Sequence, residues 1–305
     1  MNNIMELIFS AEFISSVIRV TTPILFATMA ILLSDRAGVL NISIEGTMLF
    51  AALMGVVGSA YTQSAWLGLL IAILSGVFYA GILSFFHLKL KTDIILTGIA
   101  LNLMASGLTV SILYLLTGDK GVSTALPSKV LPSVNIPMIE DIPYLGTILS
   151  GQNVLTYLSI IVLIVLSIFL KYTRTGTHIR AVGEYPTAVQ TAGISVAKTR
   201  LIALLISGGI AGMGGAFMSM AYLSMFTKDM ISGRGFIALA AEAMGRGMPL
   251  LSLLSSLLFG FADALSSSLQ LFNIPSELTR LVPYLLTIIA LGIYASKEQK
   301  KKKNL

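Results

Sequence analysis

The stretch DRAGVLNISIEG, Asp35 to Gly46, interrupts a chain that otherwise consists of long apolar runs. It brings Asp35, Arg36, Asn41 and Glu45 close together, and the next apolar run begins directly after Glu45. An unpaired carboxylate beside lipid is costly, so the charge of Glu45 needs a partner. The residues alone leave two interpretations open: an interfacial loop with hydrated charges, or a broken helix whose charges are paired inside the protein.

The composition predicts a membrane protein. Of the 305 residues, 55% are hydrophobic and 11% are charged, and the mean hydropathy is +0.89, far from the values of soluble proteins. We therefore expect an all-α, polytopic transmembrane helical bundle that forms a single transmembrane domain over residues 1–305, in contact with membrane lipid. Cysteine is absent and His87 lies far from His178 in sequence, so we expect no metal site.

The apolar runs can be measured against the roughly 20 residues that a helix needs to cross a bilayer. A segment at 235–247 is too short for a comfortable crossing, so the sequence predicts eight or nine membrane helices. The eight expected crossings are 13–34, 47–63, 65–86, 94–116, 153–170, 201–225, 249–271 and 279–296.

The distribution of Lys and Arg predicts the orientation of the chain. Five basic residues lie in the loop at 171–200 and five lysines in the C-terminal tail, which places both in the cytoplasm. The segment 117–152, with balanced charge and four prolines, is the expected extracytoplasmic loop. Parity then favours 235–247 as a thin or tilted ninth crossing. Because this positive charge is explained by orientation, nucleic-acid binding is not expected.

Small residues predict where helices approach closely. The run SGGIAGMGGAF, 207–217, contains the GxxxG pair Gly208 and Gly212. Such rows allow close backbone packing in lipid. The contact is expected within this subunit, with a subunit interface as the alternative.

The polar loop at 171–200 has a structured middle. Pro186 suits the first position of a helix and Gly193 the position after its end, so the sequence predicts a short cytoplasmic helix flanked by basic arms. A helix of about two turns is unstable alone in water. It must pack on its own membrane domain or on another protein.

Four ordered blocks carry a family resemblance. GEYPTAVQTAGISVAKTR, 183–200, resembles the cytoplasmic coupling segment of ATP-binding-cassette (ABC) importer permeases, in the family of branched-chain amino acid, ribose and nucleoside permeases. The other three blocks are LSDRAGVLNISIEG at 33–46, GIALNLMASGLT at 98–109 and GRGFIALAAEAMGRGMPLL at 233–251. The chain is most similar to the simple sugar and nucleoside permeases of this family.

The resemblance implies a permease subunit in a bacterial (inner or cytoplasmic) cell membrane, with its C-terminus in the cytoplasm. Its implied partners are a separate, tandem ATPase that binds ATP and Mg, a second homologous permease or a copy of this chain, and an extracytoplasmic substrate-binding lipoprotein. This chain is not expected to be an enzyme or to bind a cofactor, because no G-x-x-x-x-G-K-[ST] motif occurs. The residues expected to couple to the ATPase are Gly183, Glu184, Pro186, Ala188, Ala192, Gly193 and Ile194.

The resemblance also favours the broken-helix interpretation of the opening stretch. We expect a structural hinge or gate formed by Arg36, Gly38, Asn41, Glu45 and Gly46. Either Arg36 or the N-terminal amides of the next helix would neutralise Glu45.

Polar groups within apolar segments are possible pathway residues. These are Thr97, Asn102, Glu242 and Asp263. An amide such as Asn102 more often bonds a neighbouring helix than a substrate. Glu242 lies four residues before Arg246, a spacing that favours a local ion pair. GVLNISIE (38–45) and GFIALAAE (235–242) also share a Gly and a Glu at equal spacing, a weak sign of internal repetition.

The expected cargo is a nucleoside, a purine nucleoside first of all, or a related simple sugar. Ribose and branched-chain amino acids are alternatives within the family. A secondary carrier driven by Na⁺ or H⁺ is a rival of another class, for which Asp263 is the candidate ion site. A non-transporting membrane scaffold is the third possibility.

Overall fold

The computed structural model describes residues 10–137, 142, 144–270 and 285, and within them the chain is almost entirely helical. Seven helices are long and apolar enough to cross a membrane, and they match seven of the eight expected crossings. The expected crossing at 279–296 lies outside the described residues. The seven are α2 (Ala11–Asp35), α3 (Ile44–Thr62), α4 (Ala65–Ser84, continued by η1, Phe85–Lys89), α5 (Ile94–Thr117), α7 (Val154–Tyr172), α10 (Val196–Phe217, continued by η2, Met218–Tyr222) and α12 (Pro249–Leu269).

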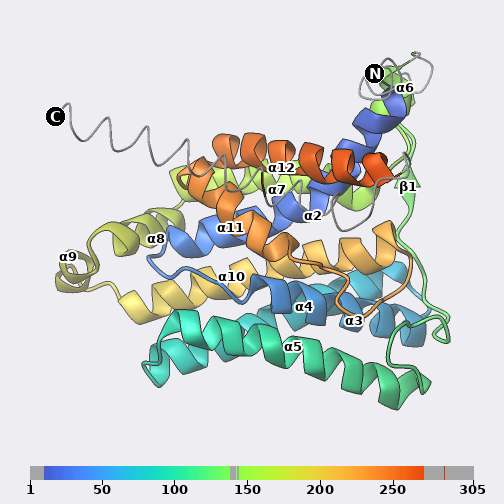
Figure 1. Cartoon of the computed structure of the whole chain (residues 1–305). Coiled ribbons are helices and arrows are strands. Elements are labelled where there is room, and N and C mark those ends of the chain that lie inside the picture. The colour runs from blue at the N-terminus through green and yellow to red at the C-terminus, as the bar shows by residue number, and fades with distance from the viewer. Residues whose placement is uncertain (1–9, 138–141, 143, 271–284, 286–305) are drawn as a thin grey trace.

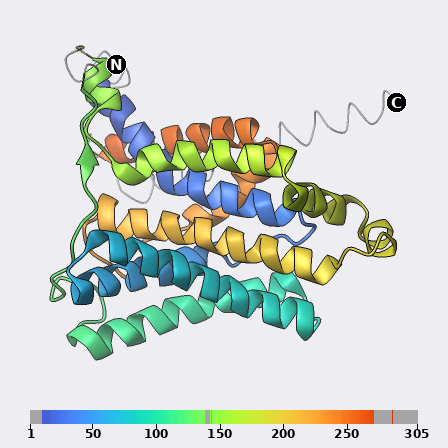
Figure 2. The same cartoon turned by 180° about the vertical axis from the view of Figure 1, so that it is seen from behind.

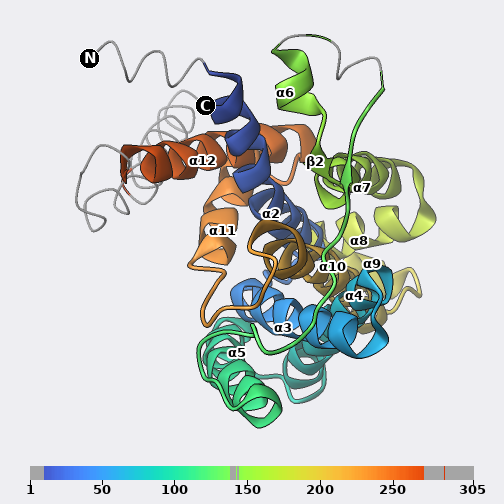
Figure 3. The ribbon, with the colours of Figure 1, turned by 90° about the vertical axis from the view of Figure 1, so that its right-hand side faces the viewer.

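Polar residues mark the starts of these helices. The side chains of Ser10, Ser64, Asp93 and Asn153 each accept a hydrogen bond from a backbone N–H in the first turn, which satisfies one of the N–H groups that a helix start leaves free. The helices α4, α5, α7 and α10 run side by side along the bundle (Figures 1 and 2), whereas α12 is seen lengthwise in Figure 3 and so crosses them at an angle. Apolar length and capping together therefore set the helix boundaries.

The centre of the bundle is formed by α2, α3 and α10, which are buried over most of their length. Seen end-on, α4 and α5 lie on one side of this centre and α7 and α12 on the other (Figure 3). The outward faces of α5 and α7 carry many exposed large apolar side chains, as expected for helices that meet lipid or another subunit.

The small-residue run on α10 packs within the subunit. A Cβ placed on Gly76 of α4 would collide with the Gly208 carbonyl oxygen and lie 3.0 Å from the Gly212 Cα. A Cβ on Gly215 would collide with the Met48 carbonyl of α3. The expectation of close helix packing inside this chain is confirmed.

One end of the bundle carries the loop at 171–200. It contains two helices, α8 (Arg174–Glu184) and α9 (Pro186–Thr191), so the prediction of a single helix with basic arms missed α8. Pro186 is the first residue of α9, and Gly193 follows its end with a φ of +81°. Both agree with the sequence-based expectation.

The opposite end of the bundle carries the 118–153 segment (Figure 1). It includes α6 (Leu145–Leu149) and a small antiparallel pair, β1 (Ser133–Val134) with β2 (Gln152–Asn153). It also reaches the chain that follows η2: the Ser123 N–H donates to the Phe226 carbonyl at 3.0 Å, and the Lys228 N–H donates to the Gly121 carbonyl at 2.8 Å. This end and the α8–α9 end therefore form the two faces of the protein.

The short helix α11 (Arg234–Gly245) has only 12 residues. At 1.5 Å per residue it is about 18 Å long, against roughly 30 Å of hydrocarbon. It begins part-way along the bundle and ends beside the last residues of α2, towards the α8–α9 end (Figure 1). The thin ninth crossing predicted at 235–247 is thus a short helix preceded by non-helical chain.

Candidate functional site

The chain between α2 and α3 is irregular and buried. It leaves the helix at Arg36, passes through Gly38 with a φ of +71°, and becomes helical again at Ile44. The side chains of Val39, Asn41 and Ser43 are buried along the way. Irregular backbone at membrane depth is tolerated only inside protein or beside a water-filled cavity, so each backbone polar group needs a partner.

Asparagine side chains provide several of these partners. The side-chain Oδ1 of Asn41 accepts from the Ser43 backbone N–H at 3.0 Å. The backbone N–H of Asn41 donates to the Ser34 hydroxyl at 3.2 Å. Asn102 of α5 donates to the Ile42 carbonyl at 3.0 Å and accepts from the Gly46 N–H at 2.8 Å. Asn102 therefore bonds a neighbouring segment, the role that its position within a helix favoured.

Glu45 binds the start of α11. Its two carboxylate oxygens accept from the Gly233 and Gly235 N–H groups, each at 2.7 Å. A Cβ on Gly235 would lie 2.8 Å from the Glu45 backbone, so only glycine fits there without displacement. The expectation that Arg36 or the amides of the next helix would neutralise Glu45 is wrong, because its partner is a helix from the other half of the chain.

Arg36 binds the opposite end of α11. Its Nε and Nη2 donate to the Gly247 carbonyl at 2.9 and 2.6 Å, and Nη2 also donates to the Arg246 carbonyl at 3.1 Å. A carboxylate at the start of a helix and a guanidinium at its end both complement the helix dipole. We call the Glu45 and Arg36 contacts together the α11 clamp.

The same segment touches α8. Gly183 lies so close that an added Cβ would collide with the Arg36 carbonyl oxygen, and a Cβ on Gly38 would lie 3.2 Å from the Gly183 Cα. Arg200 of α10 adds a hydrogen bond from Nε to the Ala37 carbonyl at 3.3 Å. Residues 36–38 are therefore held by the end of α8 and by the first turns of α10.

The expected coupling residues lie around α9, at the outer limit of this end. Val189 is buried and anchors the helix on its own domain. Pro186 and Ile194 are half-buried, as is Gly183 at the end of α8. The remaining four are exposed: Glu184, Ala188, Ala192 and Gly193.

Asp263 of α12 is paired with Arg234, the first residue of α11, at 3.0 Å. The side chains are only 19% and 14% exposed. The Arg234 guanidinium also lies over the Tyr222 ring, 5.9 Å from its centroid. The sequence marked this acid as a possible pathway residue and candidate ion site, and the structure gives it an arginine partner. Arg234 adjoins the Gly233 and Gly235 amides, so it lies directly beside the α11 clamp.

Glu242 and Thr97 lie elsewhere around the segment. Glu242 is 6% exposed, and the charges that act on it are those of Asp35 and Arg36. The local ion pair with Arg246 that the spacing favoured is therefore not among its interactions. Thr97 donates to the Asp93 carbonyl at 2.6 Å in the first turn of α5. Neither side chain joins the α11 clamp. Within the described ranges, no group of three or more potential metal ligands occurs.

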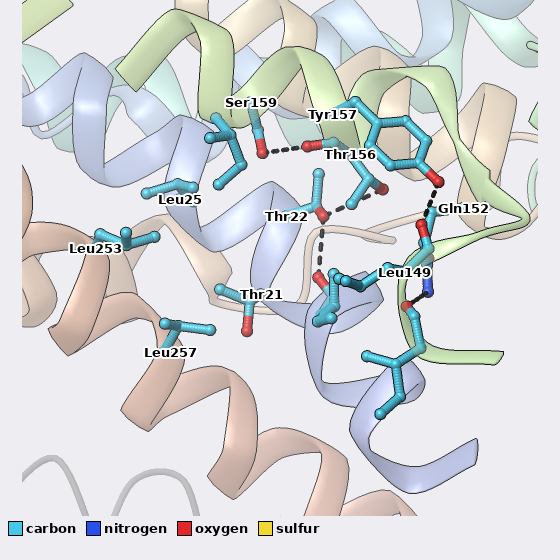
Figure 4. Close-up of a pocket in the computed structure, with 13 residues that line it drawn as sticks. Thr21, Thr22, Leu25, Leu149, Gln152, Thr156, Tyr157, Ser159, Leu253 and Leu257 are labelled. Carbon is cyan, nitrogen blue, oxygen red and sulfur yellow. Dashed lines mark hydrogen bonds between the residues drawn. The ribbon is translucent and has the colours of Figure 1, made fainter. Parts of the chain in front are cut away.

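A partly open cavity of about 230 Å³ lies between α2, α7 and α12 (Figure 4). The hydroxyl groups of Thr22 and Tyr157 donate to the Ile18 and Leu149 carbonyls at 3.0 and 2.6 Å, so they are already satisfied. The remaining lining is dominated by leucine and isoleucine. This cavity lacks free polar groups that would favour a hydrophilic cargo, and none of the predicted site residues lines it.

Sequence reasoning missed the glycines that receive the clamp, Gly233, Gly235 and Gly247. One signal pointed towards them: the Gly and Glu shared by GVLNISIE and GFIALAAE. The structure brings these two stretches into direct contact, since Glu45 of the first binds Gly235 of the second.

Comparison with known proteins identifies the family of this chain. Residues 13–291 match the family described as "Branched-chain amino acid transport system / permease component". The guanosine ABC transporter permease protein NupQ of Bacillus subtilis is 35% identical, over 92% of this chain and 91% of NupQ. The nucleoside ABC transporter permease protein NupC of Lactococcus lactis is 33% identical, over 91% of this chain and 90% of NupC.

A solved structure shares the fold. It is described as an inward-facing conformation of an ABC transporter of the metal-chelate type, and it aligns with a TM-score of 0.52 at 18% identity, over 92% of this chain and 84% of the other. Seven apolar helices and a family match over nearly the whole length lead to one assignment. The chain is a multi-pass membrane protein that belongs to the family of branched-chain amino acid transport system permease components.

Proposed function

We propose that this chain is the permease subunit of an ABC importer for nucleosides, with purine nucleosides as the first candidates. The observation that carries the proposal is the 35% identity to a guanosine permease over more than nine-tenths of both chains. The relative described as a nucleoside permease supports the same cargo class.

ATP hydrolysis is assigned to a separate subunit, a tandem ATPase that binds ATP and Mg. The sequence lacks the P-loop motif that holds the phosphates. The exposed residues Glu184, Ala188, Ala192 and Gly193 around α9 offer a surface on which such a subunit can dock. The face with α8 and α9 is then cytoplasmic, and the face with β1 and β2 is extracytoplasmic.

Two further partners complete the proposed transporter, located in a bacterial cytoplasmic membrane. A second permease, either homologous or identical, would form the other half of the translocation path. A substrate-binding lipoprotein would deliver the nucleoside to the face formed by 118–153.

The electrostatics of the interior suit an uncharged cargo. The Glu45 carboxylate accepts hydrogen bonds from two backbone amides, and the charge of Asp263 is paired with that of Arg234. An ion site of the kind that drives secondary carriers needs clustered carboxylates or unwound carbonyls that are free to bind the ion. Because Asp263 already has an arginine partner, the structure disfavours the ion-coupled carrier.

The segment 36–46 is proposed as the hinge of the permease. Interrupted helices mark the pathway in many transporters. Here the interruption between α2 and α3 contacts both α8 and α11.

The test is reconstitution of the chain in vesicles with the ATPase, the second permease and the lipoprotein. We expect uptake of radiolabelled guanosine that requires ATP and ceases when the P-loop lysine of the ATPase is replaced. Guanosine uptake by this chain alone, driven by a Na⁺ or H⁺ gradient, would overturn the proposal in favour of a secondary carrier.

A further inference from the structure

We propose that α11 is a moving gate of the permease, and that Arg36 and Glu45 are the positioning residues that make it follow α8 and α9. The inference rests on the proposed function, because it requires an ATPase that moves α8 and α9. It assigns the transmitted motion to a helix that is distant in sequence from the coupling loop. It also assigns a role to the α11 clamp, which the proposed function leaves unexplained.

The first step of transmission is the contact between α8 and the segment after α2. Gly183 and Gly38 bring two backbones together with no room for a side chain between them. Arg200 ties the neighbouring Ala37 carbonyl to α10. Close-packed backbones do not deform continuously, so displacement of the end of α8 must displace residues 36–38 with it.

The second step is the α11 clamp itself. Arg36 holds the Arg246 and Gly247 carbonyls at one end of α11, and Glu45 holds two amides at the other. Hydrogen bonds to charged groups are stronger than neutral ones. A helix of 12 residues held at both ends by one short segment moves with that segment as a rigid unit.

One face of α11 packs on the rest of the chain and the other does not. The helix contacts α2 and α12 through a small apolar cluster that includes Ile24, Ile237 and Phe259, and its Ala238 belongs to the main core. Phe236 and Ala243, on its other face, are exposed. The helix is therefore packed on one side and exposed on the other, and its first turn is joined to the start of α3 through Glu45.

A competing route runs through the covalent chain. The loop with α8 and α9 is continuous with α7 and α10, so motion of the coupling segment could tilt these two helices and leave α11 in place. The two routes differ in one respect: only the route proposed here depends on the side chains of Arg36 and Glu45.

The natural chain has no cysteine, so pairs of spin labels can be introduced without a background. One pair places Gln190→Cys on α9 and Leu103→Cys on the exposed face of α5; the other places Ala243→Cys on α11 with the same reference. Distances are measured by pulsed electron paramagnetic resonance in the full complex, without nucleotide and with trapped ATP. We expect ATP to shift both distances in the otherwise unaltered protein.

In Arg36→Gln and Glu45→Gln, we expect the Gln190 distance to shift as before and the shift of the Ala243 distance to be lost. Arg36→Lys keeps a charge at the carbonyls and should restore part of that shift. Lys120→Gln, an exposed substitution at the opposite end, is the matched control. Thermal unfolding of each variant confirms that the fold is retained.

Two results overturn the inference while the proposed function stands. One is an Ala243 shift that persists in both clamp variants; the other is an Ala243 distance that does not respond to ATP while the Gln190 distance does. If ATP moves neither label in the unaltered complex, the proposed function fails and this inference with it.

Discussion

The helices α10 and α11 both lie against α2, yet they are held in different ways. Along α10, glycines remove side chains so that its backbone meets those of α4 and α3, as at Gly208 against Gly76. The shorter α11 is held by charges at its two ends, Glu45 and Arg36. Backbone contacts fix α10 along its length, whereas α11 has charged contacts at both termini in addition to the packing of its buried face.

This difference in packing fits α10 as a rigid scaffold and α11 as the helix that we propose to move. In lipid, close van der Waals packing replaces the hydrophobic driving force, and it falls off within fractions of an ångström. A backbone-to-backbone interface such as α10–α4 therefore tolerates little displacement. The charged hydrogen bonds at its ends tie α11 to the segment between α2 and α3, and its face with Phe236 and Ala243 is exposed.

The largest effect is expected where the scaffold is disturbed. Gly76→Leu forces a side chain into the Gly208 backbone, and overpacking of this kind costs about 3 kcal/mol. Thermal unfolding in detergent should show a large drop and poor recovery of monodisperse protein. Gly81→Ala, whose added Cβ meets only Leu205 at 3.7 Å, is the control. Full stability of Gly76→Leu would contradict the role of α10 as scaffold.

A smaller loss of stability, with a large loss of uptake, is expected at the α11 clamp. Glu45→Ala leaves the Gly233 and Gly235 amides without their acceptor, at a cost of roughly 1–3 kcal/mol. ATP-dependent guanosine uptake should be abolished while folded protein is still recovered. Glu12→Gln, which removes an exposed acid from the first turn of α2, should behave as the unaltered protein. Normal uptake by Glu45→Ala would remove the distinction between the two helices.

The ion pair beside the clamp should contribute less. Asp263→Asn leaves Arg234 opposite a neutral amide, and a pair of this intermediate exposure is worth about 1–2 kcal/mol. A double-mutant cycle with Arg234→Gln, followed by thermal unfolding, measures the coupling directly. Strictly additive effects of the two substitutions would show that the pair does not help to position α11.

The smallest effect is expected on the outer face of α5. A Cβ on Gly107 meets nothing within 4 Å, so Gly107→Ala should be neutral or raise stability by up to about 1 kcal/mol through helix propensity. Uptake in the full complex should be unchanged if lipid covers this face. Lost uptake with a stable fold would instead show that the second permease packs closely at Gly107.

Much of the fold follows from apolar length and helix capping, because crossing a bilayer requires both features in the sequence. The helix α8 was missed because its sequence, RTGTHIRAVGE, is short and polar and it becomes helical only against α7 and α10. The partner of Asn102 had the expected character, a neighbouring backbone.

The partner of Glu45 could not be read from the sequence. It lies 188 to 190 residues further along the chain, at Gly233 and Gly235, and the contact exists only once α2, α3 and α11 are packed together. A Gly–Glu spacing shared by both stretches is visible in the sequence, but it does not say which residue meets which.

The hydrogen bonds between residues 121–123 and 226–228 give α11 a second connection. They join the β1–β2 face to the polypeptide that leads directly into the first turn of this helix, whereas Arg36 joins its last turn to the opposite face. Under the proposed function, the substrate-binding lipoprotein on the first face and the ATPase on the second would both act on α11, one through the chain at 226–228 and the other through Arg36.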